Sequence, residues 1–360
     1  MKIKEFGSEF DLDSNIAFLQ SPAEYISDVH LQKFRSGRDA LKAIALFYHR
    51  QTKKVLIPVL CCESMVIPFL MSGYEVVFYK INSNYTADVD DIEKNLEKGC
   101  IFLYMSYFGI DAINDSYLRK WKRNLEIISI EDRTQNILIE RDKKGFLPDI
   151  TISSIRKWLA LPDGALLWAN ENYMCNAIND DRFSDIRERA MRVKSLYLSE
   201  GVESLKDTYL SLFQSANRML DENLNIFSIS RKSEMILRQI DFNKIFNQRE
   251  LNVKILKQNL DIAKEKKLLT FITENPEKST LYFPILVEKR DEVQKLMAKE
   301  KIYCPVIWPL PREAKRICSV ADYTEKHMLA IPCDQRYSVE DMVFISEKVI
   351  KVLKSGMVND

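Results

Sequence analysis

Two side chains of complementary chemistry stand near the middle of the chain. Asp132 lies in the segment Ile130-Glu-Asp-Arg-Thr-Gln135, and Lys157 lies in Thr151-Ile-Ser-Ser-Ile-Arg-Lys-Trp158. An aldehyde cofactor such as pyridoxal phosphate needs an amine that holds it as a Schiff base and a carboxylate that keeps its pyridine nitrogen protonated. A lysine and an aspartate supply both groups, so the pair predicts pyridoxal phosphate chemistry.

Both residues follow segments that the sequence predicts to be strands. Asp132 comes after the apolar run 125–130, which is typical of a buried strand, and Lys157 comes after the β-like stretch 150–153. Ligands of open α/β sheets bind at the carboxyl ends of the strands, so the acid and the lysine can face one pocket. Ser153 and Ser154 precede the lysine, and either hydroxyl is a candidate to bind a phosphate.

Each member of the pair also has an ordinary structural interpretation. An aspartate after a strand commonly forms a turn or caps a helix. A lysine such as Lys157 is commonly solvated on the surface of a helix. The chain has 53 basic and 52 acidic residues, so spacings of this kind also arise by chance, and the surrounding segments must support the assignment.

A second candidate site lies near the beginning of the chain. Ser36 and Gly37 precede the stretch 39–48, whose apolar positions suit an amphipathic helix. Backbone N–H groups at the start of such a helix bind anions, so Ser36, Gly37, Arg38 and Asp39 are candidates to hold the cofactor phosphate. The alternatives are an ordinary capping serine beside a permissive glycine, and an arginine in a surface ion pair.

The pattern of elements predicts an α/β protein. Strand-like runs at 55–57, 75–79, 101–105 and 126–130 alternate with helix-like runs, which favours a mostly parallel sheet flanked by helices. Residues 181–258 contain no proline and are helical in composition, and the pattern of strands and helices returns after 270. We expect a large domain over 1–240, with a helical linker from about 181, and a small C-terminal α/β domain over 241–360.

Composition excludes several classes of protein. The 360 residues are 46% hydrophobic with a net charge of +1, so the chain can bury a large core and shows no broad basic face for nucleic acid or a membrane surface. Seven cysteines and three histidines lack the spacing of a metal site, and the odd cysteine count suits a reducing compartment. With no apolar run long enough for a membrane helix and no signal-peptide core at the start, we expect a cytoplasmic protein.

Several further segments occur in a characteristic order along the chain. They are Phe34-Arg-Ser-Gly-Arg-Asp-Ala-Leu41, Val55-Leu-Ile-Pro-Val-Leu-Cys-Cys-Glu-Ser64, Gly73-Tyr-Glu-Val-Val-Phe-Tyr79 with Asp88, Ser106-Tyr-Phe-Gly109, the pair Asp132 and Gln135, Phe283-Pro-Ile-Leu-Val287 with Arg290-Asp291, the stretch 302–309, and Ile331-Pro332. Through these segments the chain resembles the DegT/DnrJ/EryC1/StrS family of sugar aminotransferases, which belongs to the aspartate aminotransferase superfamily, or fold type I.

The resemblance implies a function and a set of roles. The enzyme would move an amino group from an amino acid such as glutamate to a nucleotide-linked keto sugar, as a homodimer, in polysaccharide or antibiotic sugar synthesis. Lys157 would form the internal aldimine with pyridoxal phosphate and then shuttle a proton. Asp132 would pair with the pyridinium nitrogen, Gln135 would donate to the phenolic oxygen, and Ser153 or Ser154 would bind the phosphate.

The chain also departs from the family pattern. Where the family has an aromatic residue or a histidine stacked on the cofactor ring, the nearest positions are Cys61, Cys62 and Glu63, so no residue is assigned to stacking. Cys62 is a candidate to contact the cofactor. The glycine-rich stretch after the lysine is reduced to Pro162-Asp-Gly-Ala165, and Phe227-Ser-Ile-Ser230 replaces a segment that usually carries an asparagine. Two alternatives therefore stay open: a pyridoxal phosphate lyase or dehydratase, and a non-catalytic binding or regulatory protein.

Overall fold

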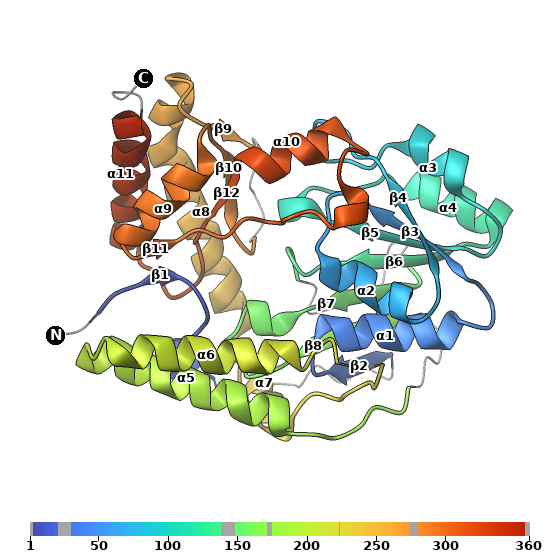
Figure 1. Cartoon of the computed structure of the whole chain (residues 1–360), viewed down its shortest axis with the longest axis horizontal. Helices are drawn as coiled ribbons and strands as arrows, with labels where there is room; N and C mark the ends of the chain where they lie inside the picture. Colours follow the sequence, from blue (N-terminus) through green and yellow to red (C-terminus); the bar gives the residue numbers. More distant parts are fainter. Residues whose placement is uncertain are drawn as a thin grey trace.

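The computed structural model describes residues 3–20, 30–137, 148–170, 175–222, 224–273 and 280–356. Its largest element is a seven-stranded sheet with the order β2-β8-β7-β6-β5-β3-β4 (Figure 1). The strands are β2 (Leu31–Phe34), β3 (Lys54–Pro58), β4 (Glu75–Tyr79), β5 (Ile101–Met105), β6 (Ile128–Asp132), β7 (Ile150–Ser153) and β8 (Ala165–Ala169). The pairs from β4 to β7 are parallel, and only β8 and β2 run antiparallel to their neighbours, so the predicted mostly parallel sheet is confirmed.

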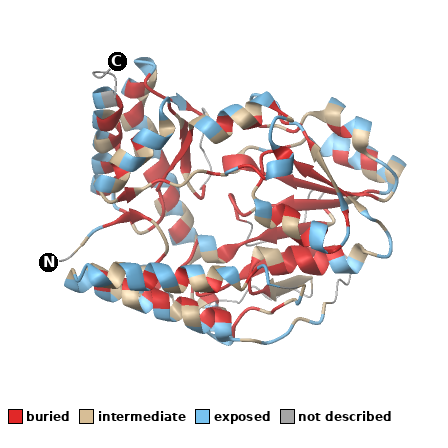
Figure 2. Cartoon of the chain, in the orientation of Figure 1, coloured by how far each residue is buried: buried red, intermediate tan, exposed pale blue. Residues whose placement is uncertain are grey.

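Helices cover both faces of this sheet. They are α1 (Gly37–Tyr48), α2 (Glu63–Met71), α3 (Val89–Asn95) and α4 (Asp115–Leu125). Because side chains alternate along a strand, Val55 and Ile57 pack with α1 and α2, whereas Leu56 packs with α3 and α4. The inner strands β3, β5, β6, β7 and β8 are buried on both faces, as Figure 2 shows, which explains why they read as continuous apolar runs in the sequence.

One strand boundary differs from the sequence prediction. The run 126–130 was expected to be a strand, but β6 begins at Ile128 and ends at Asp132. Glu126 adopts a left-handed conformation with φ 52° that closes α4, so it cannot extend the strand. Asp132 is therefore the last residue of the strand. Ile130 packs on the face that carries α1, and Asp132, two residues on, points to that same face.

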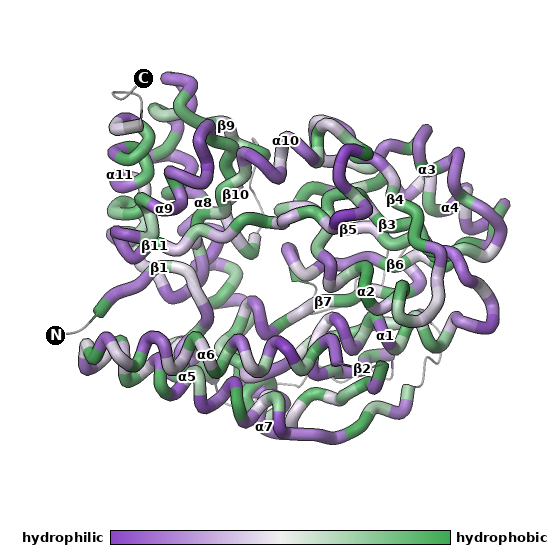
Figure 3. Tube along the Cα trace, in the orientation of Figure 1, coloured by the Kyte–Doolittle hydropathy of each residue, from purple (hydrophilic) through white to green (hydrophobic). Residues whose placement is uncertain are grey.

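The segment predicted to be helical is confirmed. It forms α5 (Arg182–Glu200), α6 (Ser204–Arg218), α7 (Arg231–Leu237) and α8 (Phe242–Glu265). Gly201 ends α5 in the left-handed conformation, with φ 74°, so α6 can turn back and run alongside α5 (Figure 1). Figure 3 shows hydrophobic and hydrophilic positions alternating along both helices, as expected of helices packed on one side only.

A second α/β unit follows. A three-stranded antiparallel sheet, β12-β10-β9, packs with the long helices of this unit, and the N-terminal strand β1 pairs with β11 beside it (Figure 1). The elements are β1 (Phe6–Gly7), β9 (Thr270–Phe271), β10 (Phe283–Leu286), α9 (Arg290–Lys299), β11 (Ile302–Tyr303), α10 (Ser319–His327), β12 (Met328–Ile331) and α11 (Val339–Gly356). Elsewhere in the chain, short 3-10 helices lie at Leu12–Phe18, Tyr107–Gly109, Ile155–Lys157 and Arg312–Ala314.

In the part of the chain that the structure describes, no helix is both long and apolar enough to cross a membrane. The same residues contain no group of three or more histidine, cysteine, aspartate or glutamate side chains placed to hold a metal ion.

Candidate functional site

Two adjoining hollows lie at the carboxyl edge of the large sheet. The larger, which we call the central cavity, has a volume of about 890 Å³ and is walled by the N-terminal segment, α6, the stretch 303–308 and residues of the large unit. The smaller, the inner pocket, has a volume of about 120 Å³ and lies against α1 and the ends of β5 to β7. Six residues line both: Arg38, Thr134, Gln135, Arg156, Lys157 and Trp308.

Asp132 lines the inner pocket and is almost fully buried. Its Oδ1 accepts a hydrogen bond from the backbone N–H of Thr134 at 2.8 Å, which fixes the carboxylate at the strand end. Burial raises the pKa of Asp132 above its ordinary value, while the hydrogen bonds from Thr134 and the charge of Lys157 oppose that shift. The buried carboxylate is therefore suited to a cationic partner within the pocket.

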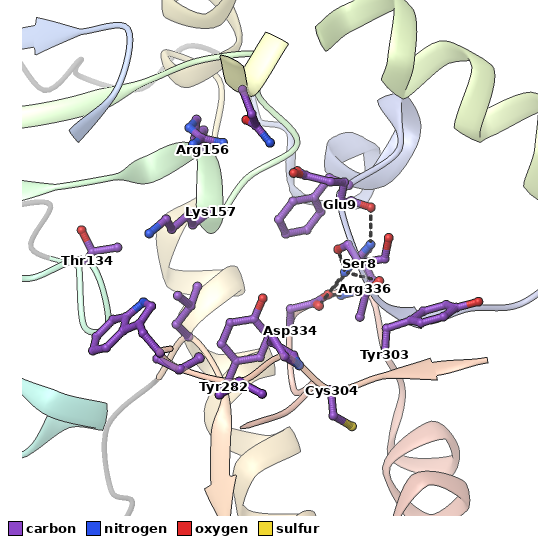
Figure 4. Close-up of a pocket in the computed structure, with 18 of the residues that line it drawn as sticks. Ser8, Glu9, Thr134, Arg156, Lys157, Tyr282, Tyr303, Cys304, Asp334 and Arg336 are labelled. Carbon is purple, nitrogen blue, oxygen red and sulfur yellow. Dashed lines mark hydrogen bonds and ion pairs between the residues drawn. The ribbon is translucent and has the colours of Figure 1, made fainter. Parts of the chain in front are cut away.

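Lys157 is exposed to the central cavity, and Thr134 fixes the segment that carries it. The Thr134 hydroxyl accepts from Ser154 N–H at 3.0 Å, and its carbonyl accepts from the Trp158 indole N–H at 2.7 Å. The helical turn Ile155–Lys157 is thus tied to the end of β6 on both sides. Figure 4 shows the Lys157 amine pointing toward Thr134. The predicted convergence of a strand-end acid and the lysine on one pocket is what the structure shows.

Gly164, the single glycine retained after the lysine, is required by the local backbone conformation. Gly164 has φ 142°, and a Cβ there would lie 3.0 and 3.1 Å from two side-chain carbons of Ile155. Its carbonyl accepts from Arg156 N–H at 3.2 Å, and its own N–H donates to the Arg35 carbonyl at 2.7 Å. Gly164 therefore holds the lysine turn against the strand that leads into α1.

Replacing Gly164 by alanine should destabilise the protein by about 1–3 kcal/mol, because the backbone conformation is strained for any other residue and Ile155 must move. Chemical denaturation of the purified variant measures this loss. Gly99→Ala is the matched control, since Gly99 has φ 75° but open space around it. An equal loss in both variants would contradict a specific clash at Gly164.

Gln135 lines both hollows with its amide held in one orientation. Its Oε1 accepts from Phe108 N–H at 2.8 Å, while its buried Nε2 has no hydrogen-bond partner among the described residues. A buried donor without an acceptor is costly, so this N–H requires an acceptor in the pocket. An oxygen anion of a ligand meets that requirement.

The start of α1 forms the opposite end of the inner pocket. Ser36, Gly37 and Arg38 line it, and Ser36 caps the helix by accepting from Asp39 N–H at 3.2 Å. A Cβ on Gly37 would lie 3.6 Å from the Ser154 Cβ, so the two segments approach closely. The Ser36 hydroxyl donates to Asp39 at 2.6 Å, so backbone N–H groups and the Ser154 hydroxyl are the donors that gather where a phosphate can bind.

Two of the predicted phosphate residues do not line the pocket. Asp39 is fully buried and forms a two-point ion pair with Arg35, at 2.9 and 3.0 Å, so its role is structural. Ser153 ends β7 with a buried hydroxyl that has no partner among the described residues, whereas Ser154 faces the inner pocket. Strand alternation explains the difference, because Ile152 and Ser154 point to the same side. Arg38 does line the pocket, although Asp221 pairs with it at 2.7 Å.

Cys62 also lines the inner pocket and hydrogen-bonds Ser64 through its sulfur, at 2.8 Å. Cys61 is fully buried and does not line it. Trp308 was not predicted to belong to the site, yet it lines both hollows and lies against Tyr107, with ring centroids 6.5 Å apart. The only sequence signal for it was an aromatic residue within the family-like stretch 302–309.

A second group of residues that was not predicted from the sequence joins the two units next to Trp158. The buried Arg249 of α8 donates to the carbonyl of Trp158 at 3.4 Å and to Gln335 at 2.8 Å, and Gln335 donates to the same Trp158 carbonyl at 2.7 Å. The Arg249 guanidinium also lies over the Trp158 ring, 4.2 Å from its centroid. The residue that follows Lys157 is thus held by the second unit.

The replaced asparagine segment has a structural role here. Ser230 caps α7, and both its N–H and its hydroxyl donate to Asp163, at 2.8 and 2.7 Å. The Phe227 carbonyl accepts from Arg35 N–H, and the Arg35 guanidinium lies 4.0 Å from the Phe227 ring centroid. Asn225 is exposed and does not line either hollow.

The chain was compared with known proteins by sequence and by structure. No protein-family model and no curated protein matches the sequence. Among solved structures, NtdA from Bacillus subtilis with bound cofactor PMP gives a TM-score of 0.63 at 15% identity, over 95% of this chain and 81% of NtdA. The Helicobacter pylori aminotransferase PseC, involved in the biosynthesis of pseudoaminic acid, gives 0.63 at 14% identity, over 98% of this chain and 100% of PseC. A DegT DnrJ EryC1 StrS aminotransferase from Brucella abortus gives 0.56 at 14% identity, over 96% and 93%.

This chain has the fold of the type I aminotransferases. The predicted fold class is therefore confirmed, including the seven-stranded sheet and the smaller C-terminal α/β unit. Within fold type I, the residues of this chain fit pyridoxal phosphate: a buried acid, an unsatisfied amide donor and a cavity-facing amine surround the inner pocket, with an anion-binding helix start at its far end.

Proposed function

We propose that this protein is a pyridoxal-phosphate-dependent aminotransferase that acts on a sugar, as a member of the DegT/DnrJ/EryC1/StrS family. The observation that carries the proposal is the convergence of Asp132, Gln135 and Lys157 on one pocket, with the Gln135 Nε2 lacking an acceptor. The likeness to sugar aminotransferases over nearly the whole chain supports it.

Each residue has a role that its surroundings support. When bound, pyridoxal phosphate supplies an aldehyde and an electron sink. Asp132 would stay ionised beside the cationic ring nitrogen and so keep that nitrogen protonated. Gln135 would donate a hydrogen bond to the phenolic oxygen. Ser36, Gly37 and Ser154 bind the phosphate. The Lys157 Nζ would hold the cofactor through its aldehyde, and the free amine would move a proton to and from the substrate carbon.

The finer assignments follow from the family resemblance. We propose glutamate as the amino donor and a nucleotide-linked keto sugar as the acceptor, and the volume of the central cavity, about 890 Å³, is large enough for a sugar nucleotide. We also propose a cytoplasmic homodimer, and a domain boundary near Asp241, where α8 begins.

The test is a spectral titration of the purified protein with pyridoxal phosphate, followed by glutamate. We expect a visible absorption band of a lysine-bound cofactor, which glutamate converts to the amine form of the cofactor with release of 2-oxoglutarate. A band that no amino acid converts would favour a lyase or dehydratase, and the absence of any band would favour the non-catalytic alternative.

A further inference from the structure

Four arginines line the central cavity, and they differ in how their charges are neutralised. They are Arg38, Arg156, Arg249 and Arg336. Arg38 pairs with Asp221 at 2.7 Å, and Arg336 pairs with Asp334 at 2.7 Å through two nitrogens. Arg249 is satisfied by Gln335 and by backbone carbonyls.

Arg156 has no such partner. Its Nε is buried without a hydrogen bond, and no ion pair of its guanidinium occurs among the described residues. Burial, together with the nearby charge of Arg187, lowers the pKa of Arg156 to about 9. The group is still cationic at neutral pH, and because the residue is only partly buried, its guanidinium can reach a ligand in the cavity while its buried Nε lacks an acceptor.

The two acids whose charges act on Arg156, Glu9 and Asp163, already accept hydrogen bonds from other residues. Glu9 accepts from Arg187 at 2.8 Å, and its pKa falls to about 2, chiefly through Arg187, which outweighs the opposing effect of burial. Asp163 accepts from the Ser230 hydroxyl at 2.7 Å and from Ser230 N–H at 2.8 Å. Figure 4 shows Glu9 across the cavity from Lys157, beside Arg336. Arg156 therefore keeps donors for a ligand.

The position of Arg156 restricts which anion it can meet. It lines both hollows and directly precedes Lys157, and its backbone N–H is fixed to the Gly164 carbonyl at 3.2 Å. In an α-amino acid the amine and the carboxylate are bonded to the same carbon. An amino acid whose amine reacts beside Lys157 therefore places its α-carboxylate close to Arg156. The phosphate already has the helix start at Gly37 and the Ser154 hydroxyl.

We propose that Arg156 binds the α-carboxylate of the amino donor and so selects α-amino acids for the first half of the reaction. This inference rests on the proposed function, because it assumes that an amino acid donates the amine. The planar guanidinium suits a carboxylate, to which it donates two parallel hydrogen bonds.

The test compares Arg156→Gln with the wild-type protein, both loaded with cofactor, using three donors in single-turnover measurements. Glutamate has both carboxylates, isoglutamine has an amide in place of the α-carboxylate, and glutamine has an amide in place of the γ-carboxylate. We expect Arg156→Gln to lower the rate constant over Kd for glutamate by about 10-fold to 100-fold, since hydrogen bonds to charged groups are lost. The rate constant over Kd for glutamine should fall by the same factor, and that for isoglutamine should be nearly unchanged.

Lys295→Gln is the matched control, because Lys295 is an exposed cation at the same cavity. Its effect on glutamate should be less than about twofold, as expected of a solvated charge. Equal losses for glutamate and isoglutamine in Arg156→Gln would overturn the proposal.

Two binding measurements separate this proposal from the proposed function. Calorimetry with glutarate, on protein without cofactor, should show binding that Arg156→Gln weakens at least about 10-fold, whether or not the protein transaminates. Titration with inorganic phosphate and with pyridoxal phosphate should be unchanged by the substitution. If Arg156→Gln instead weakened phosphate and cofactor binding and left glutarate binding intact, Arg156 would serve the phosphate and our assignment would be wrong.

Discussion

Replacing Lys157 by alanine should abolish the visible absorption band of the lysine-bound cofactor and lower the rate of transamination by about 10³-fold or more. The physical reason is that this side chain faces the pocket that Asp132 and Gln135 also line, and among the described residues no second lysine lines the inner pocket. Absorption spectra and single-turnover rates of both proteins measure the effect.

Stability separates this result from misfolding. Lys157 is exposed, and its amine has no hydrogen bond or ion pair among the described residues, so the alanine variant should unfold at the same denaturant concentration as the wild type. Added methylamine should restore part of the rate, because a small amine can enter the central cavity and carry the proton. A variant that kept the absorption band would refute the assignment of Lys157.

Replacing Asp132 by asparagine should lower the transamination rate by about 10² to 10³-fold while stabilising the cofactor-free protein at neutral pH. The first effect follows from the loss of the charge that holds a ring nitrogen protonated. The second follows from the pKa of Asp132, which burial raises above 3.8, so that ionisation of the buried carboxyl costs folding free energy. Rates and denaturation curves of both proteins test the two effects.

The sign of the pH dependence can be stated for the same variant. Because the folded pKa lies above the unfolded one, protonation of Asp132 stabilises the fold at low pH, and that contribution is lost as the pH rises from about 4 through the folded pKa. The stability difference between Asp132→Asn and wild type should thus grow over this range and then level off. Bound cofactor should reverse the order, since a cationic ring nitrogen favours the ionised acid. A pH-independent difference would contradict the raised pKa.

Some of this site was predictable from the sequence because it depends on local order. Asp132 and Gln135 follow an apolar strand, and the start of α1 is marked by a serine and a glycine, so their neighbourhood could be predicted from the sequence around them. The choice between Ser153 and Ser154 required the face of the strand, which follows only once Ile152 is known to line the pocket. These local patterns also predicted the sheet.

Other parts of the site depend on contacts between distant segments. Trp308 reaches the inner pocket from beyond β11, and Arg249 reaches the Trp158 carbonyl from α8. That Arg156 has no ion pair among the described residues is visible only after Glu9 and Asp163 have been placed, since the sequence neighbours of Arg156 carry no information on either acid. Such features are properties of the tertiary packing and not of any one segment.

The hydrogen bonds that Arg249 and Gln335 donate to the Trp158 carbonyl join the second unit to the turn that carries Lys157. Both residues belong to the second unit, yet they hold the peptide next to the reactive amine, and Arg249 also holds the carbonyls of Thr280 and Leu281. A fragment that ended before α8 would retain the seven-stranded sheet, Asp132 and Lys157, but it would lack the contacts that fix the lysine turn from behind. We therefore expect such a fragment to bind pyridoxal phosphate more weakly than the whole chain does.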